Sequence, residues 1–145
     1  METLEFTIRI KASKEKVWSV LWDDKNYRKW VNVFCEGSYA ESNWNEGDKI
    51  HFISPDGRGM NSIIEKKIPN EYMAFKHMGE LENFKEVPLN AETEKWSGSM
   101  ETYRLTPDDE FIVLTTQMDI DEKYNDYFKD TFPKALEVIK ELSEN

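Results

Sequence analysis

The chain opens with apolar and polar residues in strict alternation. Leu4, Phe6, Ile8 and Ile10 alternate with charged or hydroxylated residues. A period of two places successive side chains on opposite faces of an extended chain. Residues 4–10 are therefore predicted to form a strand with one buried face.

Two short helices are predicted to follow this strand. Ser13 is a natural N-cap, and Val17, Val20 and Leu21 recur at helical spacing behind it. Asp23 and Asp24 then interrupt the pattern. The second helix is expected to carry the apolar residues Tyr27, Trp30, Val31 and Phe34.

The middle of the chain is predicted to be a run of strands. Alternation and turn residues place them at 36–41, 49–54, 59–68, 73–77, 97–106 and 110–120. Pro55-Asp56-Gly57 and Pro107-Asp108-Asp109 are predicted turns, because these residue types favour tight chain reversal. The stretch 81–95 lacks a regular pattern and is expected to be a long exposed loop.

The last segment carries the strongest helical pattern. Its apolar positions recur at steps of three and four: Tyr124, Tyr127, Phe128, Thr131, Phe132, Ala135, Leu136, Ile139 and Leu142. Pro133 lies inside this pattern and is expected to kink the helix or restart it. The order of elements predicts an α+β fold, in which a curved antiparallel sheet of about six or seven strands wraps around a long C-terminal helix.

Length and charge limit the functions that this fold could serve. The chain has 145 residues, and 1–145 is expected to be one domain. Its net charge of −10 argues against nucleic acid, whose binding depends on Lys and Arg. The N-terminal alternation is unlike a signal peptide, and no apolar run approaches a membrane span. A cytoplasmic protein without membrane insertion is the expectation.

The residue types for metal or nucleophilic chemistry are sparse. Cys35, His51 and His77 are the only thiol or imidazole groups, and no two lie at a zinc-binding spacing. The chain has no nucleophile, phosphate-binding or dinucleotide-binding motif. We therefore expect no metal and no cofactor, and we assign no catalytic residue.

Aromatic residues are the main candidates for a binding site. The predicted inner surfaces of the short helices, the sheet and the last helix carry Trp22, Trp30, Phe34, Phe52, Phe75, Tyr124, Phe128 and Phe132. Such a set can line a concave apolar space that binds a small molecule. It can equally fill a core without any ligand, because aromatic rings bury much area.

Polar residues on two predicted strands could join that space. Period two places His77 on the face of Met73 and Phe75, where it could bond a ligand or carry a proton. Glu101 shares a face with Tyr103, and a carboxylate facing an apolar cavity could act as an acid or base. The simpler placements are favoured: His77 at a strand end, and Glu101 turned outward by a one-residue shift in register.

Four phrases follow one another along the chain: Ala12–Trp18 (ASKEKVW), Tyr27–Trp30 (YRKW), Trp44–Asp48 (WNEGD) and Ile64–Phe75 (IEKKIPNEYMAF). In this order they resemble the START-like, or SRPBCC, superfamily, whose helix-grip fold is that of the birch-pollen allergen. The sequence is most similar to the branch of the C-terminal domain of the activator of heat-shock-protein-90 ATPase. It departs from that pattern at Glu46, where a glycine is usual, and at His77, where an aromatic residue is usual.

The resemblance implies a hydrophobic or amphipathic ligand, such as a lipid, between the sheet and the C-terminal helix. Two alternatives stay open. The branch implies a protein-interaction module that contacts a chaperone. The wider superfamily implies a small cyclase or hydrolase that would use the same cavity, with His77 or Glu101 as its reactive group.

Overall fold

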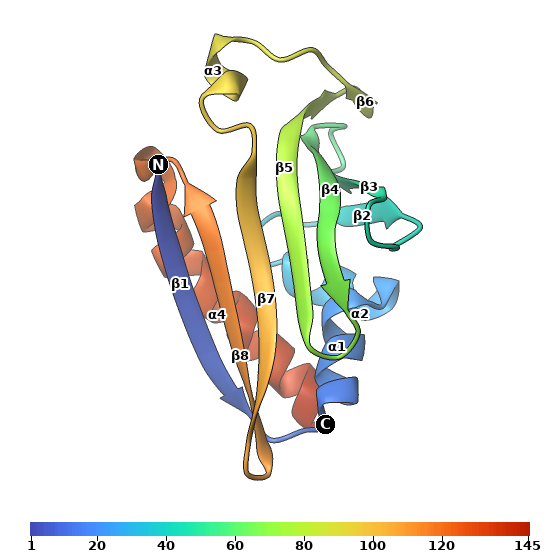
Figure 1. Cartoon of the computed structure of the whole chain (residues 1–145), viewed down its shortest axis with the longest axis vertical. Coiled ribbons are helices and arrows are strands. Elements are labelled where there is room, and N and C mark those ends of the chain that lie inside the picture. The colour runs from blue at the N-terminus through green and yellow to red at the C-terminus, as the bar shows by residue number, and fades with distance from the viewer.

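A curved antiparallel sheet with helices on its inner face makes up the protein (Figure 1). The computed structural model describes residues 1–145. The main order of the sheet is β1 (Glu2–Ile10), β8 (Phe111–Ile120), β7 (Ser99–Asp108), β5 (Tyr72–Glu82), β4 (Gly59–Ile68), β3 (Lys49–Ile53) and β2 (Tyr39–Ser42). A short strand, β6 (Lys85–Glu86), pairs with β5.

The first strand pairs with the last along its whole length. The register runs from Glu2 opposite Ile120 to Ile10 opposite Ile112. In Figure 1 the blue β1 and the orange β8 lie side by side. This pairing brings the N-terminal segment next to the start of the C-terminal helix α4 (Asn125–Glu144).

Helices cover the inner face in two parts. Helix α4 packs against β1 and against the short helices α1 (Lys14–Trp22) and α2 (Asp24–Val31). Figure 1 shows α4 crossing behind β1, β8 and β7, while α1 and α2 lie behind the β4 and β5 side. The inner face is therefore shared between one long helix and a pair of short ones.

Local signals in the sequence explain the two short helices. The predicted cap is present, because the Ser13 hydroxyl accepts a hydrogen bond from the Lys16 amide at 3.1 Å. The Trp30 indole N–H donates to the carbonyl of Leu21 at 3.1 Å and ties the helices together. The two short helices and the long terminal helix were thus predicted correctly, except that the second helix ends at Val31 and does not include Phe34.

The core lies between the sheet and these helices. Ile10, Ile64, Leu114 and Ile139 are completely buried there. Each such side chain contributes roughly 1.5–3 kcal/mol through removal from water. Alternate residues of each strand face this core, as the period-two pattern predicted.

The stretch 81–95 is more ordered than the sequence indicated. Strand β5 continues to Glu82, turns at Asn83 and Phe84, and returns as β6. Both turn residues have positive φ (50° and 65°), as a two-residue hairpin of this kind requires. A short helix, α3 (Ala91–Glu94), follows with Asn90 as its cap. The expected long loop was therefore wrong, and β6 brings the strand number to eight.

Two prolines lie inside regular elements. Pro107 lies inside β7 opposite Ile112, and the chain reverses later, at Asp109 and Glu110. The pairing of β7 with β5 ends at Arg104, so the ring at position 107 faces an edge that needs no N–H donor. Helix α4 continues through Pro133 without restarting. None of the helices combines the length and the apolar character needed to cross a membrane.

A close backbone approach at Gly59 provides a test of the sheet. A Cβ there would lie 1.8 Å from the Phe52 carbonyl oxygen in β3, so Gly59→Ala should lower the free energy of unfolding by more than about 3 kcal/mol. Gly47 has φ 89° but would meet no atom within 4 Å. Gly47→Ala should therefore lower the free energy of unfolding by only about 1–2 kcal/mol, through backbone strain. If urea denaturation showed equal losses of stability for the two variants, this account would be wrong.

Candidate functional site

A chain of polar side chains crosses the inner face of the sheet. The Ser62 hydroxyl oxygen lies 2.6 Å from His77 Nδ1, and His77 Nε2 lies 2.9 Å from Glu101 Oε1. The Tyr103 hydroxyl donates a hydrogen bond to the second oxygen of Glu101. We call these four residues the inner network.

Strand register brings the four residues of the inner network together. Ser62 on β4 lies directly opposite His77 on β5. A shift in register just before this pair leaves Met78 without a partner and is a β-bulge, a feature that redirects side chains. Glu101 and Tyr103 come from β7, two residues apart and hence on one face.

Burial decreases along the inner network from the serine to the carboxylate. Ser62 is completely buried, and the His77 side chain is 9% exposed. The Glu101 side chain is 22% exposed. The structure thus places His77 within β5 and Glu101 on the inner face, and the favoured strand-end and outward placements were wrong. Glu101 is thus the least buried of the four residues.

The charge of Glu101 is stabilised by its neighbours. Burial raises the pKa of its carboxyl group, but the hydrogen bonds of His77 and Tyr103, together with the positive charge of His77 when its ring is protonated, more than offset this. The net pKa lies below the ordinary value, so Glu101 is ionised at neutral pH. Burial, and then the charge of Glu101, raise the pKa values of Tyr103 and of the neighbouring Tyr27. Both phenols therefore stay protonated.

The inner network has the residue types of a hydrolase relay but not its geometry. A neutral imidazole satisfies both contacts when Ser62 donates to Nδ1 and Nε2–H donates to Glu101. Ser62 has no exposed surface, so a substrate cannot reach its hydroxyl. A nucleophile must contact the reacting atom, and the least buried residue of the network is Glu101 instead of Ser62.

Aromatic rings surround the inner network. Trp22 packs edge-on against Phe75 and Tyr103, with centroid distances of 5.3 Å and 4.9 Å. Phe52 contacts both Phe75 and His77. We call seven of these rings the Trp22 cluster: Trp22, Tyr27, Trp30, Trp44, Phe52, Phe75 and Tyr103. The indole N–H of Trp22 is buried in this cluster without a hydrogen-bond partner.

Trp44 joins the cluster in an unusual backbone conformation. Its φ is 64°, which a bulky residue rarely adopts. The amide of Trp44 donates to the Ser42 hydroxyl at 3.0 Å, and its carbonyl accepts from Lys67 Nζ at 2.7 Å. These bonds hold the strained residue so that its ring contacts Trp22 and Phe75. Strained backbone of this kind clusters at active sites and ligand-binding positions.

The predicted site residues fall into two groups. Trp22, Trp30, Phe52, Phe75, His77, Glu101 and Tyr103 lie together in or beside the Trp22 cluster. Phe34, Phe128 and Phe132 pack on one another and on Phe6 in a second cluster, the Phe132 cluster. None of the ring pairs joins the two clusters, and Tyr124 is 50% exposed. The terminal helix thus contributes no ring to the surroundings of the inner network.

Three important residues were not singled out from the sequence. Ser62 shares the inward period of Ile64, so alternation could have placed it inside. Tyr27 was expected in a helix but not beside a charge. Trp44 was assigned to a turn, and no pattern signals that its ring returns to the core.

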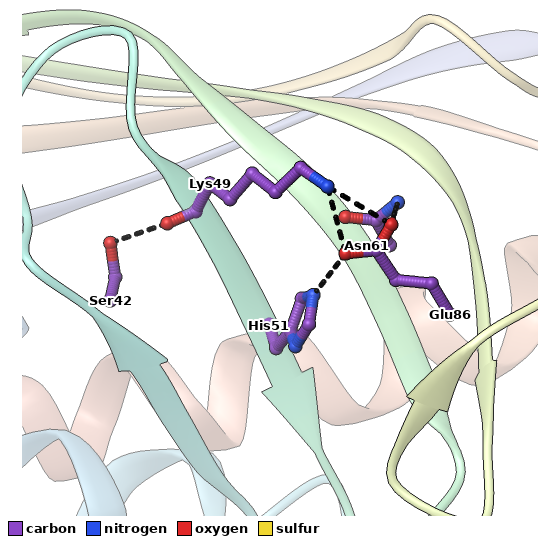
Figure 2. Close-up of polar contacts among 5 residues, drawn as sticks. All are labelled: Ser42, Lys49, His51, Asn61 and Glu86. Atoms are coloured by element: carbon purple, nitrogen blue, oxygen red, sulfur yellow. Dashed lines mark hydrogen bonds and ion pairs between the residues drawn. The ribbon is translucent and has the colours of Figure 1, made fainter.

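A separate polar cluster lies on the outer face of the sheet (Figure 2). Glu86 on β6 accepts from Lys49 Nζ at 3.0 Å and contacts His51 Nε2 at 2.9 Å. The side-chain amide of Asn61 donates to the same carboxylate at 3.1 Å. The neighbouring hollow is lined only by polar residues: Glu41, Ser42, Asn43, Asp48, Lys49 and His51. The cluster fastens the β6 hairpin to β3 and β4.

Comparison with known proteins identifies the fold. No protein-family model matches the chain, and no curated protein matches it. The solution structure of the Aha1 dimer from Colwellia psychrerythraea is similar with a TM-score of 0.75 and 21% identity, covering 99% of this chain and 97% of that one. The protein has a helix-grip fold. The fold predicted from the sequence is therefore confirmed, and the likeness to the Aha1 structure is a likeness of fold.

Two further solved structures support the same fold. The crystal structure of MLL2253 from Mesorhizobium loti gives a TM-score of 0.73 at 16% identity, over 97% of this chain and 96% of that one. The solution structure of ChR145 from Cytophaga hutchinsonii gives 0.70 at 19% identity, over 97% and 92%. The likeness extends along nearly the whole chain in each case.

Acid titration tests the state of Glu101. The pKa of Glu101 is lower in the folded protein than in the unfolded chain, where it is about 4.3. Ionisation of Glu101 therefore stabilises the fold at pH values above the unfolded pKa. This stabilisation is lost as the pH falls through the folded pKa. The advantage of wild type over Glu101→Gln in free energy of unfolding should therefore shrink between neutral and acid pH.

Glu86→Gln is the matched comparison, because hydrogen bonds from Lys49 and His51 lower the pKa of Glu86 as well. That group lies at the surface, so added salt should weaken its pH effect more than the effect of Glu101. If the difference in free energy of unfolding between wild type and Glu101→Gln does not change with pH, Glu101 is not held ionised by its neighbours.

Proposed function

We propose that the protein binds a hydrophobic or amphipathic small molecule on the inner face of the sheet, against β4, β5 and β7. The observation that carries this proposal is the partly exposed Glu101 within the Trp22 cluster. A largely apolar, aromatic surface with a few converging polar groups is the usual composition of a small-molecule site. The helix-grip fold is compatible with such a site, and the chemistry of the inner face supports it.

The alternative, a core that binds no ligand, explains the aromatic rings of the Trp22 cluster but not the charged Glu101. Aromatic side chains alone would pack well in this position. An ionised carboxylate costs free energy when it is withdrawn from water, and buried ion pairs can often be replaced by apolar residues without loss of stability. Glu101 and His77 are therefore poor choices for stability alone, and a role in binding explains their presence.

Two further features support a binding surface at this place. Phe52, Trp44 and Glu101 remain half-buried although they belong to the inner face, so part of that face is open to contact. The unpartnered indole N–H of Trp22 is a buried donor. Buried donors are normally satisfied, and an acceptor atom of a ligand would satisfy this one.

Binding of prodan, a neutral hydrophobic fluorophore, tests the proposal. Its excitation overlaps tryptophan emission, so binding near the Trp22 cluster should transfer energy from the protein to the probe, with saturation. Phe52→Trp enlarges a half-buried ring of the cluster and should weaken binding at least about tenfold, or roughly 1.4 kcal/mol.

Phe128→Trp is the control, since Phe128 belongs to the Phe132 cluster and should leave prodan affinity unchanged. Loss of binding in Phe128→Trp but not in Phe52→Trp would move the site to the terminal helix. The absence of saturable binding to wild type would overturn the proposed function.

A further inference from the structure

We propose that the ligand carries a protonated amine at its polar end and that Glu101 binds this amine. The inference rests on the small-molecule site proposed above and adds the chemical class of its ligand. It follows from three properties of the site: an unbalanced charge, unused hydrogen-bonding capacity, and aromatic faces beside it.

The charge of Glu101 is not balanced by a permanent cation. Its only ion-pair partner is His77, whereas the other carboxylates in ion pairs contact Lys, Arg or both Lys and His. When His77 takes the neutral form that suits Ser62, the inner network carries one negative charge. A cation from outside the chain is the partner that this charge lacks.

The carboxylate also has room for another donor. An ionised carboxylate has about four acceptor positions on its two oxygens. His77 and Tyr103 occupy one on each oxygen, and the side chain is 22% exposed. An ammonium group can therefore donate to Glu101 without displacing either neighbour.

Aromatic faces next to a carboxylate favour a cation further. Phe75 lies directly opposite Glu101 in the sheet, and its ring contacts Trp22, Trp44 and Phe52. The faces of such rings attract ammonium groups, with tryptophan the most effective. Of these rings, Trp44 and Phe52 are half-buried and could provide an apolar surface for the rest of an amphipathic amine.

Other polar ends fit the site less well. A carboxylate or phosphate would be repelled by Glu101 and by a protein of net charge −10. A hydroxyl could donate a hydrogen bond but would leave the charge unbalanced. Charge-assisted hydrogen bonds are roughly twice as strong as neutral ones, which favours the amine.

Three probes with the same tail test the inference: octylamine, octanol and octanoate. Binding of each is measured by the change in intrinsic tryptophan fluorescence of the whole protein at neutral pH. Octylamine should bind at least about tenfold more tightly than octanol, and octanoate most weakly. This preference should persist at high salt, because a partly buried pair is screened little, whereas attraction to the surface charge disappears.

Glu101→Gln should abolish the preference for octylamine, and Glu86→Gln, which removes a carboxylate from the outer face, should keep it. Equal binding of all three probes would overturn the amine inference and leave the proposed function standing. No binding of any probe would overturn both. If the preference for octylamine survives in Glu101→Gln, or vanishes in wild type at high salt, it arises from the net charge of the protein. Either result would also overturn the inference. The salt comparison needs no variant to fold.

Discussion

The packing of the helices on the inner face of the sheet is the contact on which the core and the candidate site depend. A sheet that buries one face needs a partner layer, and here two helical units divide that task. Helix α4 packs against β1, and Phe132 stacks on Phe6 with a centroid distance of 5.0 Å. Trp22 of α1 covers β5 and β7 instead. This division explains why the aromatic residues form two clusters, and why the inner network lies beneath the short helices.

The inner network combines features that a purely structural core would avoid. It keeps a carboxylate among aromatic rings, and it needs a β-bulge beside His77 to aim the imidazole. Trp44 adds a strained backbone next to the same rings. Several local departures of this kind, gathered in one place, are typical of sites where function competes with stability.

Much of the fold could be predicted because its signals are local. Alternation in residues 4–10 and the cap at Ser13 depend only on near neighbours along the chain. The side on which Glu101 lies depends on register, which a one-residue shift reverses. Periodicity shows which residues face inward but not which part of the inner face they reach, so Phe128 and Phe75 could not be separated. The hairpin at Asn83 and Phe84 was missed because neither residue is a glycine, the usual choice at positive φ.

The pairing of β1 with β8 has a consequence for the biosynthesis of the protein. On the ribosome β1 emerges first, but Ile10 cannot meet Ile112 until more than two thirds of the chain has followed it. Until then its row of apolar side chains and its unpaired backbone groups stay open to other chains. Closure of the sheet must therefore wait until β8 has been synthesised, and its rate is limited by closure of this long loop. The nascent chain is most vulnerable to aggregation during that interval.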